Sequence, residues 1–325
     1  MLDQYGRIID YIRVSVTDRC NLRCVYCMPE EGVEQVGHTD ILSYAEIIRL
    51  CRIFVRLGIK HIKLTGGEPL VRKGLPDLAG GIRGIPGIED VTLTTNGVLL
   101  KEQIGELYEA GIRSVNVSLD TLDGAVFQRI TRRDLIDKVF DGLRECMKYP
   151  DIRLKINCVP LERTNEDEWV KIAGIARDYP IDVRFIELMP IGFGKEYHGE
   201  TQEIIQKKLE TAYGSPRELS GSFGNGPSVY MAYPEFAGKI GFISAISHKF
   251  CSRCNRVRLT SEGYLKLCLQ YTDGLDLREL LRSGKADEEI FNAITKAIER
   301  KPKNHQFTGE EMDNFEQHEM SRIGG

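Results

Sequence analysis

The sequence predicts an α/β protein: a partial (β/α)6 barrel of the TIM type with a C-terminal α+β extension that covers the barrel opening. Two observations support this fold class. Six segments rich in β-branched residues alternate with helical patterns as far as Leu188, and short hairpin patterns replace the alternation afterwards. Such alternation predicts a parallel sheet with right-handed crossovers. Because six units are too few to close an eight-stranded barrel, we expect an open one.

The first unit begins with a strand over Tyr11 to Val16. A cysteine-rich loop follows, and then an amphipathic helix over Ser43 to Leu57. Ser43 is a suitable N-cap, Glu46 stands three residues later as in a capping box, and Gly58 can end the helix. These local signals predict both ends of the helix.

Five further units follow along the chain. Their strand patterns span His61 to Thr65, Asp90 to Thr95, Arg113 to Asp120, Arg153 to Val159 and Asp182 to Leu188. Helical patterns lie between them, for example Lys101 to Ala110, Leu135 to Lys148 and Glu166 to Arg177. Polar, Gly-rich or Cys-rich turns follow nearly every strand, which is typical of a barrel mouth that holds a site.

The C-terminal region has a different pattern. After SGSFGNGPS, a passage rich in Gly and Ser, short strands and hairpins are predicted over Val229 to Tyr233, Lys239 to Ser244, Val257 to Thr260 and Tyr264 to Leu269. Helical patterns return near Leu277 to Leu281 and Asp287 to Ile298, and the polar tail from Lys301 predicts disorder. We therefore divide the chain into a barrel core, residues 1–225, and an extension, residues 226–325.

Composition narrows the class of protein. The 44 Lys and Arg and 48 Asp and Glu give a formal charge of -4, which argues against a general nucleic-acid or membrane-surface protein. Without a membrane-spanning run or an apolar signal segment, we expect a cytoplasmic protein. Nine cysteines, six of them in two tight groups, fit metal or cluster ligation in a reducing compartment. Cys51, Cys146 and Cys158 lie in apolar stretches and are expected to be buried small hydrophobes.

The first cysteine group consists of Cys20, Cys24 and Cys27, in the pattern C-x3-C-x2-C. A cubane iron–sulfur cluster normally takes four thiolates, so three leave one iron open to a ligand that is not protein. A structural zinc site or a disulfide loop is the alternative, but zinc sites are usually closed by a fourth Cys or His nearby. The spacing resembles the signature of the radical S-adenosylmethionine (SAM) enzymes. In that family SAM binds the open iron and is cleaved to a 5'-deoxyadenosyl radical.

The loop TGGEP, Thr65 to Pro69, directly follows the second strand. Adjacent glycines let the backbone approach a ligand, and their free N–H and C=O groups can bind an amino acid. Alone the motif is more typical of a turn. One unit after the cysteine loop it matches the glycine motif with which the family binds the SAM amino group. Polar side chains also end the third and fourth strands, in TTNG from Thr94 and NVSLD from Asn116.

The second cysteine group is Cys251, Cys254 and Cys268, in the pattern C-x2-C-x13-C. A zinc knuckle completed by His248 or by a remote residue is one interpretation. Several cations crowd the group, although the protein as a whole is acidic: Lys249, Arg253, Arg256 and Arg258. Alternate residues of a strand share one face, and paired guanidinium groups suit a phosphate. The second group therefore indicates a cluster or metal site beside an anion site.

The two cysteine groups, the stretch FIELMP, the block CNRVRLT and the C-terminal MSRIGG together resemble the GTP 3',8-cyclases of molybdenum cofactor biosynthesis, the MoaA family. The resemblance runs from about Arg7 to Gly325. It implies that the first group holds a [4Fe-4S] cluster, with SAM contacts at Tyr26, Gly66, Gly67, Glu68, Ser118 and Met189. It implies a second [4Fe-4S] cluster at the second group, where the open iron binds the guanine of GTP. The implied GTP contacts are Arg13, Lys63, Thr94, Lys155, Arg256, Val257 and Arg258. Lys63 departs from the pattern, since some relatives carry Arg there.

The resemblance also implies a reaction and partners. The radical abstracts the ribose 3' hydrogen of GTP, the carbon radical attacks C8 of the same guanine, and reduction gives (8S)-3',8-cyclo-7,8-dihydroguanosine 5'-triphosphate. The catalytic set so implied is Cys20, Cys24, Cys27, Arg256, Arg258, Gly324 and Gly325, the glycines forming a tail that threads toward the chamber. An electron donor such as flavodoxin or ferredoxin, delivery of the product to the synthase MoaC, and a monomer or homodimer are expected.

Two other functions are open. Another radical SAM enzyme with an auxiliary cluster, of the peptide-maturase type, would usually carry more C-terminal cysteines than the three beyond residue 160. A non-catalytic metal-binding protein, such as an electron carrier or a zinc-binding interaction protein, explains neither the glycine loop nor the arginines beside the second cysteine group.

Overall fold

One open sheet organises the chain. The computed structural model describes residues 1–33, 36–37, 39–221, 223–307 and 313–324. In these residues twelve strands pair in the order β12-β11-β10-β1-β2-β3-β4-β5-β6-β9-β8-β7. The barrel strands are β1 (Tyr11–Ser15), β2 (His61–Thr65), β3 (Asp90–Thr95), β4 (Ser114–Ser118), β5 (Arg153–Cys158) and β6 (Asp182–Ile186). β7 (Arg217–Leu219) precedes the extension, which adds β8 (Val229–Ala232), β9 (Ile240–Ile243), β10 (Arg256–Leu259), β11 (Tyr264–Lys266) and β12 (Gly274–Asp276).

The strands β1 to β6 are parallel to their neighbours, as the alternating pattern predicts. The extension lengthens this parallel sheet at both edges, because β10 pairs in parallel with β1 and β9 in parallel with β6. The predicted hairpin between β10 and β11 is present and turns at Thr260 to Gly263. The sequence analysis missed β7 and β12, which are only three residues long. The proposed division at residue 225 stays a prediction.

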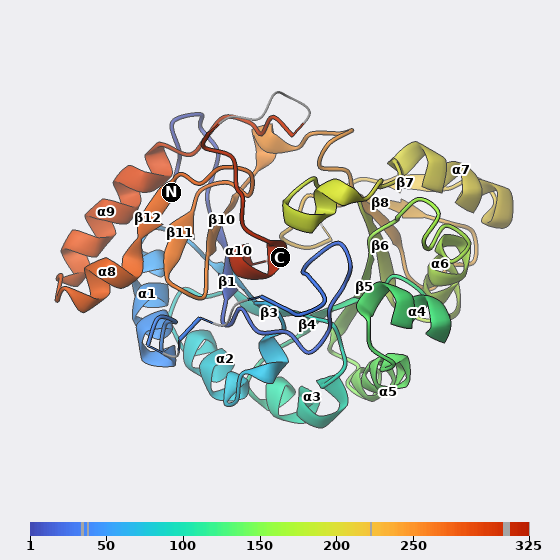
Figure 1. Ribbon diagram of the computed structural model, residues 1–325, viewed down its shortest axis with the longest axis horizontal. Helices are drawn as coiled ribbons and strands as arrows, with labels where there is room; N and C mark the ends of the chain where they lie inside the picture. Colours follow the sequence, from blue (N-terminus) through green and yellow to red (C-terminus); the bar gives the residue numbers. More distant parts are fainter. Residues whose placement is uncertain (34–35, 38, 222, 308–312, 325) are drawn as a thin grey trace.

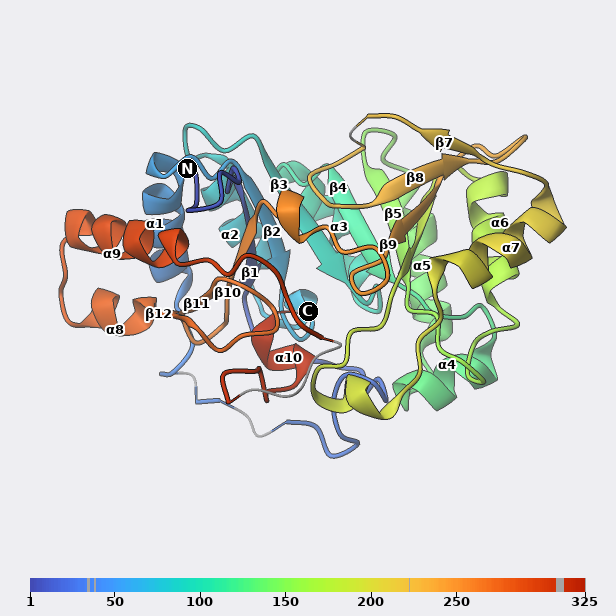
Figure 2. The same ribbon diagram turned by 90° about the horizontal axis from the view of Figure 1, so that it is seen from above.

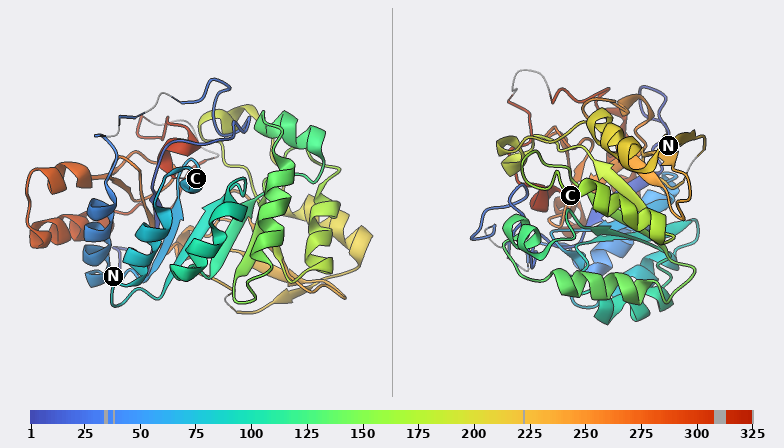
Figure 3. Two further views of the ribbon diagram at one scale, coloured as in Figure 1. Left: turned by 90° about the horizontal axis from the view of Figure 1, so that it is seen from below. Right: turned by 90° about the vertical axis from the view of Figure 1, so that its right-hand side faces the viewer.

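Helices cover the outer face of the sheet, as Figure 1 shows for α1 to α6 and Figure 3 shows from below. They are α1 (Tyr44–Arg56), α2 (Leu75–Arg83), α3 (Leu100–Glu109), α4 (Gly124–Thr131), α5 (Ile136–Cys146), α6 (Trp169–Asp178) and α7 (Gln202–Tyr213). The extension contributes α8 (Leu277–Arg282), α9 (Asp287–Glu299) and α10 (Met320–Ile323). The predicted capping box of Ser43 and Glu46 is present on α1. No helix among the described residues is long and apolar enough to cross a membrane.

The two faces of the barrel strands differ in chemistry. Residues that face the helices are apolar and fully buried, for example Val14, Leu64 and Leu93. Residues at the alternate positions face the interior, and many of them are charged or polar. The interior of a TIM-type barrel is normally filled by Val, Ile and Leu. This barrel instead encloses a cavity of about 710 Å³.

The C-terminal tail is ordered in its described residues, 301–307 and 313–324, so the prediction of disorder is wrong for them. Its anchor is a buried ion pair between Glu316 and Lys266 of β11. The backbone N–H of Glu316 also donates to the Gln270 carbonyl, at 2.6 Å. Seen from above in Figure 2, the tail ends at α10, close to the centre of the molecule. Tail order thus depends on partners that are distant in sequence.

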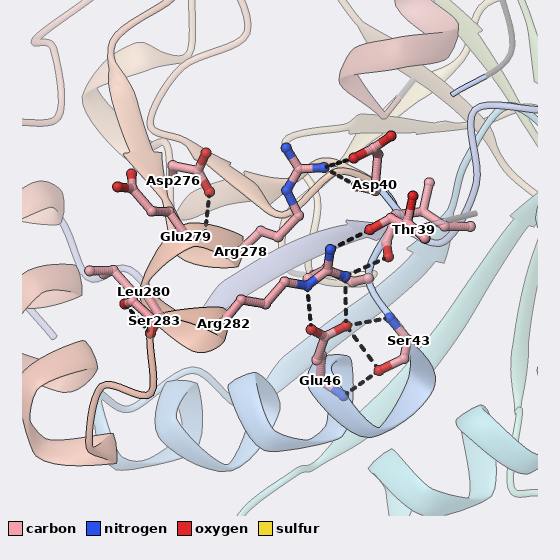
Figure 4. A network of polar contacts seen from close by, with 12 residues as sticks. Thr39, Asp40, Ser43, Glu46, Asp276, Arg278, Glu279, Leu280, Arg282 and Ser283 are labelled. Atoms are coloured by element: carbon pink, nitrogen blue, oxygen red, sulfur yellow. Dashed lines mark hydrogen bonds and ion pairs between the residues drawn. The ribbon is translucent and has the colours of Figure 1, made fainter. Parts of the chain in front are cut away.

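Figure 4 shows the polar network that joins α8 of the extension to the start of α1. Arg282 donates to both carboxylate oxygens of Glu46, at 2.8 and 3.2 Å, and to the Ile41 carbonyl at 3.0 Å. Arg278 reaches the Asp40 carboxylate at 3.4 Å. Hydrogen bonding to Arg282 is the main cause that lowers the pKa of Glu46 to about 2.

We expect Arg282→Met to lower the free energy of unfolding by about 1 kcal/mol at pH 7, the upper range for a partly exposed pair. The contribution of Glu46 is present above its ordinary pKa of 4.5 and is lost as pH falls through about 2. The difference between wild type and variant should therefore shrink in urea unfolding curves as the pH falls from 5 to about 2. Arg52→Met, at an exposed position of α1, the helix that carries Glu46, is the control. A difference that is independent of pH would contradict this account.

Candidate active site

The first cysteine group lies on the loop between β1 and α1. This loop runs along the end of α4, where the N–H groups of Arg23 and Val25 donate to the carbonyls of Thr131 and Ile130, both at 2.9 Å. The loop therefore satisfies carbonyl groups that a helix end leaves without partners. Arg132 binds the loop from the other side, donating to the Arg23 and Met28 carbonyls, both at 3.2 Å. All nine cysteines of the chain are free thiols.

The three thiols share an environment that suits a metal cluster. Burial raises the pKa of Cys20 to about 11 and that of Cys27 to about 12, and the neighbouring cysteines oppose ionisation of Cys24 further. Hydrogen-bond donors nevertheless point at the sulfurs: the Leu22 N–H is 3.4 Å from Cys20 Sγ, and the Ser321 backbone donates to Cys27. Three thiolates so close together need a cationic centre between them.

The donor atoms of the first cysteine group suit a cluster, because cysteine thiolates are the usual ligands of iron–sulfur centres. A cubane distributes its cysteine ligands over separate iron atoms. At the second cysteine group, the alternative zinc ligand His248 is exposed and instead bonds Glu203 at 2.5 Å. The residues therefore fit an iron–sulfur cluster.

The glycine loop packs against the chain that leads into the cysteine loop. A Cβ on Gly66 would lie 2.7 Å from the Thr17 carbonyl oxygen, and one on Gly67 would lie 2.5 Å from that of Asp18. These positions leave no room for a side chain, which explains both glycines. The N–H of Gly67 donates to the Thr17 carbonyl at 2.7 Å. Contact between these glycines and SAM stays a prediction.

Glu68 is fully buried, and its carboxylate connects the glycine loop to the end of β3. It accepts from the Leu70 N–H at 3.0 Å, the Thr95 hydroxyl at 2.7 Å and the Asn96 N–H at 2.6 Å. Burial raises the pKa of Glu68 to about 7. Both carboxylate oxygens are engaged by the protein, so Glu68 positions the loop around the first cysteine group.

The other predicted SAM residues lie at the same mouth of the barrel. Ser118 ends β4, and Met189 follows β6. The Tyr26 hydroxyl donates to Asp120 at 2.6 Å, and the same carboxylate accepts from the Val159 N–H at 2.8 Å. The sequence analysis named NVSLD without assigning a role to its aspartate. The structure places Asp120 as the partner that orients Tyr26.

Basic side chains form a layer inside the barrel. Strand register places Arg258 beside Arg13, and Arg13 beside Lys63. A second row continues through Thr94, Asn116 and Lys155, which pair successively across β3, β4 and β5. The predicted GTP contacts that line the cavity are Arg13, Lys63, Thr94, Lys155 and Arg256. Val257 is buried in the apolar core, so only its backbone is available to a ligand.

The charge of this layer is poorly balanced. Burial, followed by repulsion from Arg184 and Arg13, holds the pKa of Lys63 well below its ordinary value. The same two kinds of cause hold the pKa of Arg258 well below its ordinary value. Arg256 Nε is buried without a hydrogen-bond partner. Lys155 does have a carboxylate neighbour, Asp182, at 3.2 Å. A surplus of buried cations around a cavity favours a polyanionic ligand.

The sequence analysis missed two parts of this cavity. Arg184 lines it and donates to Asn157 Oδ1 at 2.9 and 2.6 Å; its place on the inner face of β6 was the available signal. Described residues of the Gly- and Ser-rich passage, to which the sequence analysis gave no role, also line the cavity. In that passage Phe223 accepts from Lys155 Nζ at 2.8 Å, and Asn225 donates to Asp90 at 2.8 Å.

The second cysteine group lies at the opposite end of the barrel strands. Cys251 begins a 3-10 turn over Cys251–Arg253, Cys254 precedes β10, and Cys268 follows β11. Its neighbours Phe250, Arg253 and Asn255 line the cavity. Burial opposes the ionisation of Cys254, yet the cations Lys301, Arg256 and Arg7 keep its pKa below the ordinary value. The cavity therefore borders the second cysteine group, whereas the first group lies at the other end of the barrel strands.

The tail enters the barrel on the side of the first cysteine group, where the Ser321 backbone hydrogen-bonds Cys27. Arg258 Nη1 donates to the carbonyl of Gly324. Gly324 has a φ of +78°, and a Cβ there would lie 3.3 Å from that of Ser15 on β1. The tail thus lies inside the barrel, next to the predicted anion site, and Gly325 lies outside the described residues.

Comparison of folds supports a radical SAM architecture. The crystal structure of Streptococcus suis SuiB bound to S-adenosylmethionine is similar to this chain with a TM-score of 0.61 and 13% identity, covering 87% of this chain and 68% of SuiB. SuiB bound to its precursor peptide SuiA gives a TM-score of 0.58, again at 13% identity, over 88% of this chain and 67% of SuiB. At these identities the likeness extends to the fold alone.

Sequence comparison is more specific. Residues 14–176 match the family model of the Radical SAM superfamily, and residues 181–307 match Molybdenum Cofactor Synthesis C. The GTP 3',8-cyclase of Clostridium perfringens (strain 13 / Type A) is 45% identical over 330 residues, and that of Heliobacterium modesticaldum is 44% identical over 328; both alignments cover 100% of both chains. The chain therefore belongs to the GTP 3',8-cyclase family of the radical SAM superfamily.

Proposed function

We propose that this enzyme converts GTP to (8S)-3',8-cyclo-7,8-dihydroguanosine 5'-triphosphate, with SAM as the source of the initiating radical, as the first step of molybdenum cofactor biosynthesis. The observation that carries the proposal is a cation-lined cavity of about 710 Å³ inside a barrel that has a group of three cysteines at each end of its strands. One end suits the radical source, and the other end suits the nucleotide. A closed metal protein without chemistry would not need the cavity.

In this proposal Cys20, Cys24 and Cys27 hold a [4Fe-4S] cluster, which with bound SAM supplies a 5'-deoxyadenosyl radical. The chain positions this chemistry. Donors from Leu22 and Ser321 stabilise the thiolates. The SAM contacts stay those expected from the resemblance: Tyr26, Gly66, Gly67, Glu68, Ser118 and Met189.

Cys251, Cys254 and Cys268 are proposed to hold a second [4Fe-4S] cluster, with its open position available to the guanine of GTP. The backbone N–H of Arg256 supports this role, because it hydrogen-bonds Cys254. Phe250 lines this end of the cavity and lies against the Arg256 guanidinium, with 5.4 Å to the ring centroid, which favours a cation–π interaction. The base would thus be fixed while the ribose lies toward the first group.

The triphosphate is proposed to lie on the basic layer. Arg13, Lys63, Lys155 and Arg256 line the cavity, and Arg184 is a further candidate that the structure adds. Arg258 is engaged by the Gly324 carbonyl, so this arginine could exchange the tail for phosphate. The energetic role of the layer is to neutralise the polyanion and to orient the ribose 3' hydrogen.

The partners belong to the same proposal. A one-electron donor such as flavodoxin or ferredoxin would re-reduce the first cluster, and the cyclised product would pass to the synthase MoaC. We propose a cytoplasmic monomer or homodimer. The nine free thiols support a reducing compartment.

The test combines iron analysis with product formation under anaerobic conditions. We expect about eight irons per reconstituted wild-type chain and about four for Cys251→Ala, as loss of one cubane requires. With GTP, SAM and dithionite, wild type should form 5'-deoxyadenosine and the cyclised nucleotide, which mass spectrometry detects. Arg256→Ala should lose GTP binding, and Arg300→Ala, at an exposed position, should keep it. If 5'-deoxyadenosine forms but GTP is never cyclised, the enzyme has another substrate.

A further inference from the structure

Lys301 is a buried lysine for which the described residues supply no carboxylate partner. It is 2% exposed and lies two residues after the end of α9. Its ammonium donates to the carbonyl of Leu267, the residue before Cys268. Among the described residues, no carboxylate oxygen lies within 4.0 Å of its Nζ. The nearby anionic groups are the cysteines, since Lys301 acts electrostatically on both Cys251 and Cys254.

Two other buried lysines have a carboxylate partner, whereas Lys63 belongs to the basic layer of the cavity. The buried Lys266 is paired with Glu316, and Lys155 has Asp182 at 3.2 Å. An ammonium that is buried without an anion costs several kcal/mol, so a folded protein rarely keeps one. The end of α9 is a possible source of negative potential. The ammonium hydrogen-bonds another segment, however, and not the carbonyls of α9.

A second cation near the group is already neutralised. Arg7 donates to the carbonyls of Cys251 and Lys303, both at 2.9 Å, and fastens the cysteine turn to the segment after α9. Its own charge is balanced by Asp3, at 2.6 Å. Arg7 therefore orders the backbone of the cysteine turn. The charge of Lys301, by contrast, is available to act on the thiolates of the second cysteine group.

We propose that Lys301 is the buried counter-ion of the second cluster, a positioning residue that favours the thiolate ligands and the reduced state of the cluster. The inference rests on the proposed function, because it requires a cluster at Cys251, Cys254 and Cys268. One-electron reduction makes such a cluster more negative, and a cation close to its ligands stabilises the added charge. Without the cluster, the same ammonium is an unpaired buried charge.

The proposal predicts that Lys301→Met has opposite effects in two forms of the full chain. In the cluster-free form the variant should unfold at the same or a higher urea concentration than wild type, since an apolar side chain replaces an unpaired charge. In the reconstituted form it should lose the second cluster to a chelator about tenfold faster. The midpoint potential of that cluster, from a dye-mediated titration followed by EPR, should fall by about 59 mV, equivalent to tenfold for one electron.

Two variants provide controls. Lys303→Met, at an exposed position two residues away, should match wild type in each measurement. Lys301→Arg keeps the positive charge, so the midpoint potential of its second cluster should stay close to that of wild type. If Lys301→Met destabilises both forms alike, Lys301 is only a ligand of the Leu267 carbonyl, and the proposal is overturned. If reconstituted Lys301→Met holds about eight irons per chain and the midpoint potential of its second cluster is unchanged, the proposal is also overturned. The proposed function would then still stand. About four irons per wild-type chain would instead show that the chain binds one cluster, which contradicts the proposed function as well.

Discussion

Lys63→Met is expected to stabilise the nucleotide-free protein while it weakens GTP binding about 100-fold. Lys63 lies beside Arg13 in the interior layer, and Arg258 lies on the other side of Arg13. Burial and repulsion from other cations disfavour the charged form of Lys63, as its strongly lowered pKa indicates. Methionine has a similar length and carries no charge. The substitution should therefore raise the free energy of unfolding when no nucleotide is present.

The loss of affinity follows from the same geometry. A triphosphate in the cavity would pair with the layer, and removing one member of a buried charge pair typically costs 2–5 kcal/mol. About 100-fold weaker binding corresponds to the lower part of that range, at about 1.4 kcal/mol per factor of ten. Neighbouring cations in the layer would offset the rest. If the cations of the layer repel one another and are kept for binding GTP, removing one of them should increase stability and reduce function.

The measurements are urea unfolding without nucleotide and anaerobic calorimetric titration with GTP. Lys60→Met is the matched control, because Lys60 precedes β2 and is 53% exposed beside Glu89. It should change neither quantity appreciably. A Lys63→Met protein that unfolds more readily would show that the layer is not under repulsion. Unchanged GTP affinity would show that the triphosphate does not bind at Lys63.

The parts of the fold that depend on local pattern could be predicted from the sequence. The barrel strands and the capping box of Ser43 and Glu46 are such features, because residue spacing alone defines them. The cysteine groups were found for the same reason. The family resemblance predicted most of the basic residues that line the cavity, and strand register brings them together.

The missed features depend on pairing between distant segments. The extension contributes β9 and β10 to opposite edges of the barrel sheet, and no local signal distinguishes that from a separate cover. The Gly-rich passage has the composition of a linker, but Phe223 and Asn225 find partners on β5 and β3. Alternation on β6 showed that Arg184 shares a face with Asp182, but not that this face is the interior of a barrel. Composition predicted a disordered tail because it does not report partners elsewhere in the chain.

Glu316→Ala is expected to release the tail. The Lys266–Glu316 pair is almost completely buried, with side chains 2% and 3% exposed. Removing one partner of such a pair typically costs 3–5 kcal/mol, because the other charge remains buried alone. The tail can leave without unfolding the barrel, so the cost should appear as local opening. Hydrogen exchange over residues 313–324 should accelerate by at least about 100-fold, whereas that of the barrel strands should change little.

Docking of the tail should depend on pH, because Glu316 must be ionised to pair with Lys266. Although burial opposes ionisation, hydrogen bonding to Lys266 keeps the pKa of Glu316 below its ordinary 4.5. The pair therefore stabilises the docked tail above pH 4.5, and this contribution is lost as pH falls through the lowered pKa. Protection of the wild-type tail against hydrogen exchange should therefore decline in acid. In Glu316→Ala this protection should be low at every pH. Asp313→Ala, at an exposed position of the same segment, is the control.

A double variant separates the charge pair from simple packing. Lys266→Met together with Glu316→Met removes both charges and fills a similar volume, and such replacements are often neutral or stabilising. The tail of the double variant should regain protection and lose its pH dependence. Since Gly324 is also held by Arg258, cyclisation by the double variant should return toward wild type once the tail docks again. If the double variant remains unprotected, the hydrogen bond that the Glu316 carboxylate accepts from the His318 N–H positions the tail, and the ion pair does not.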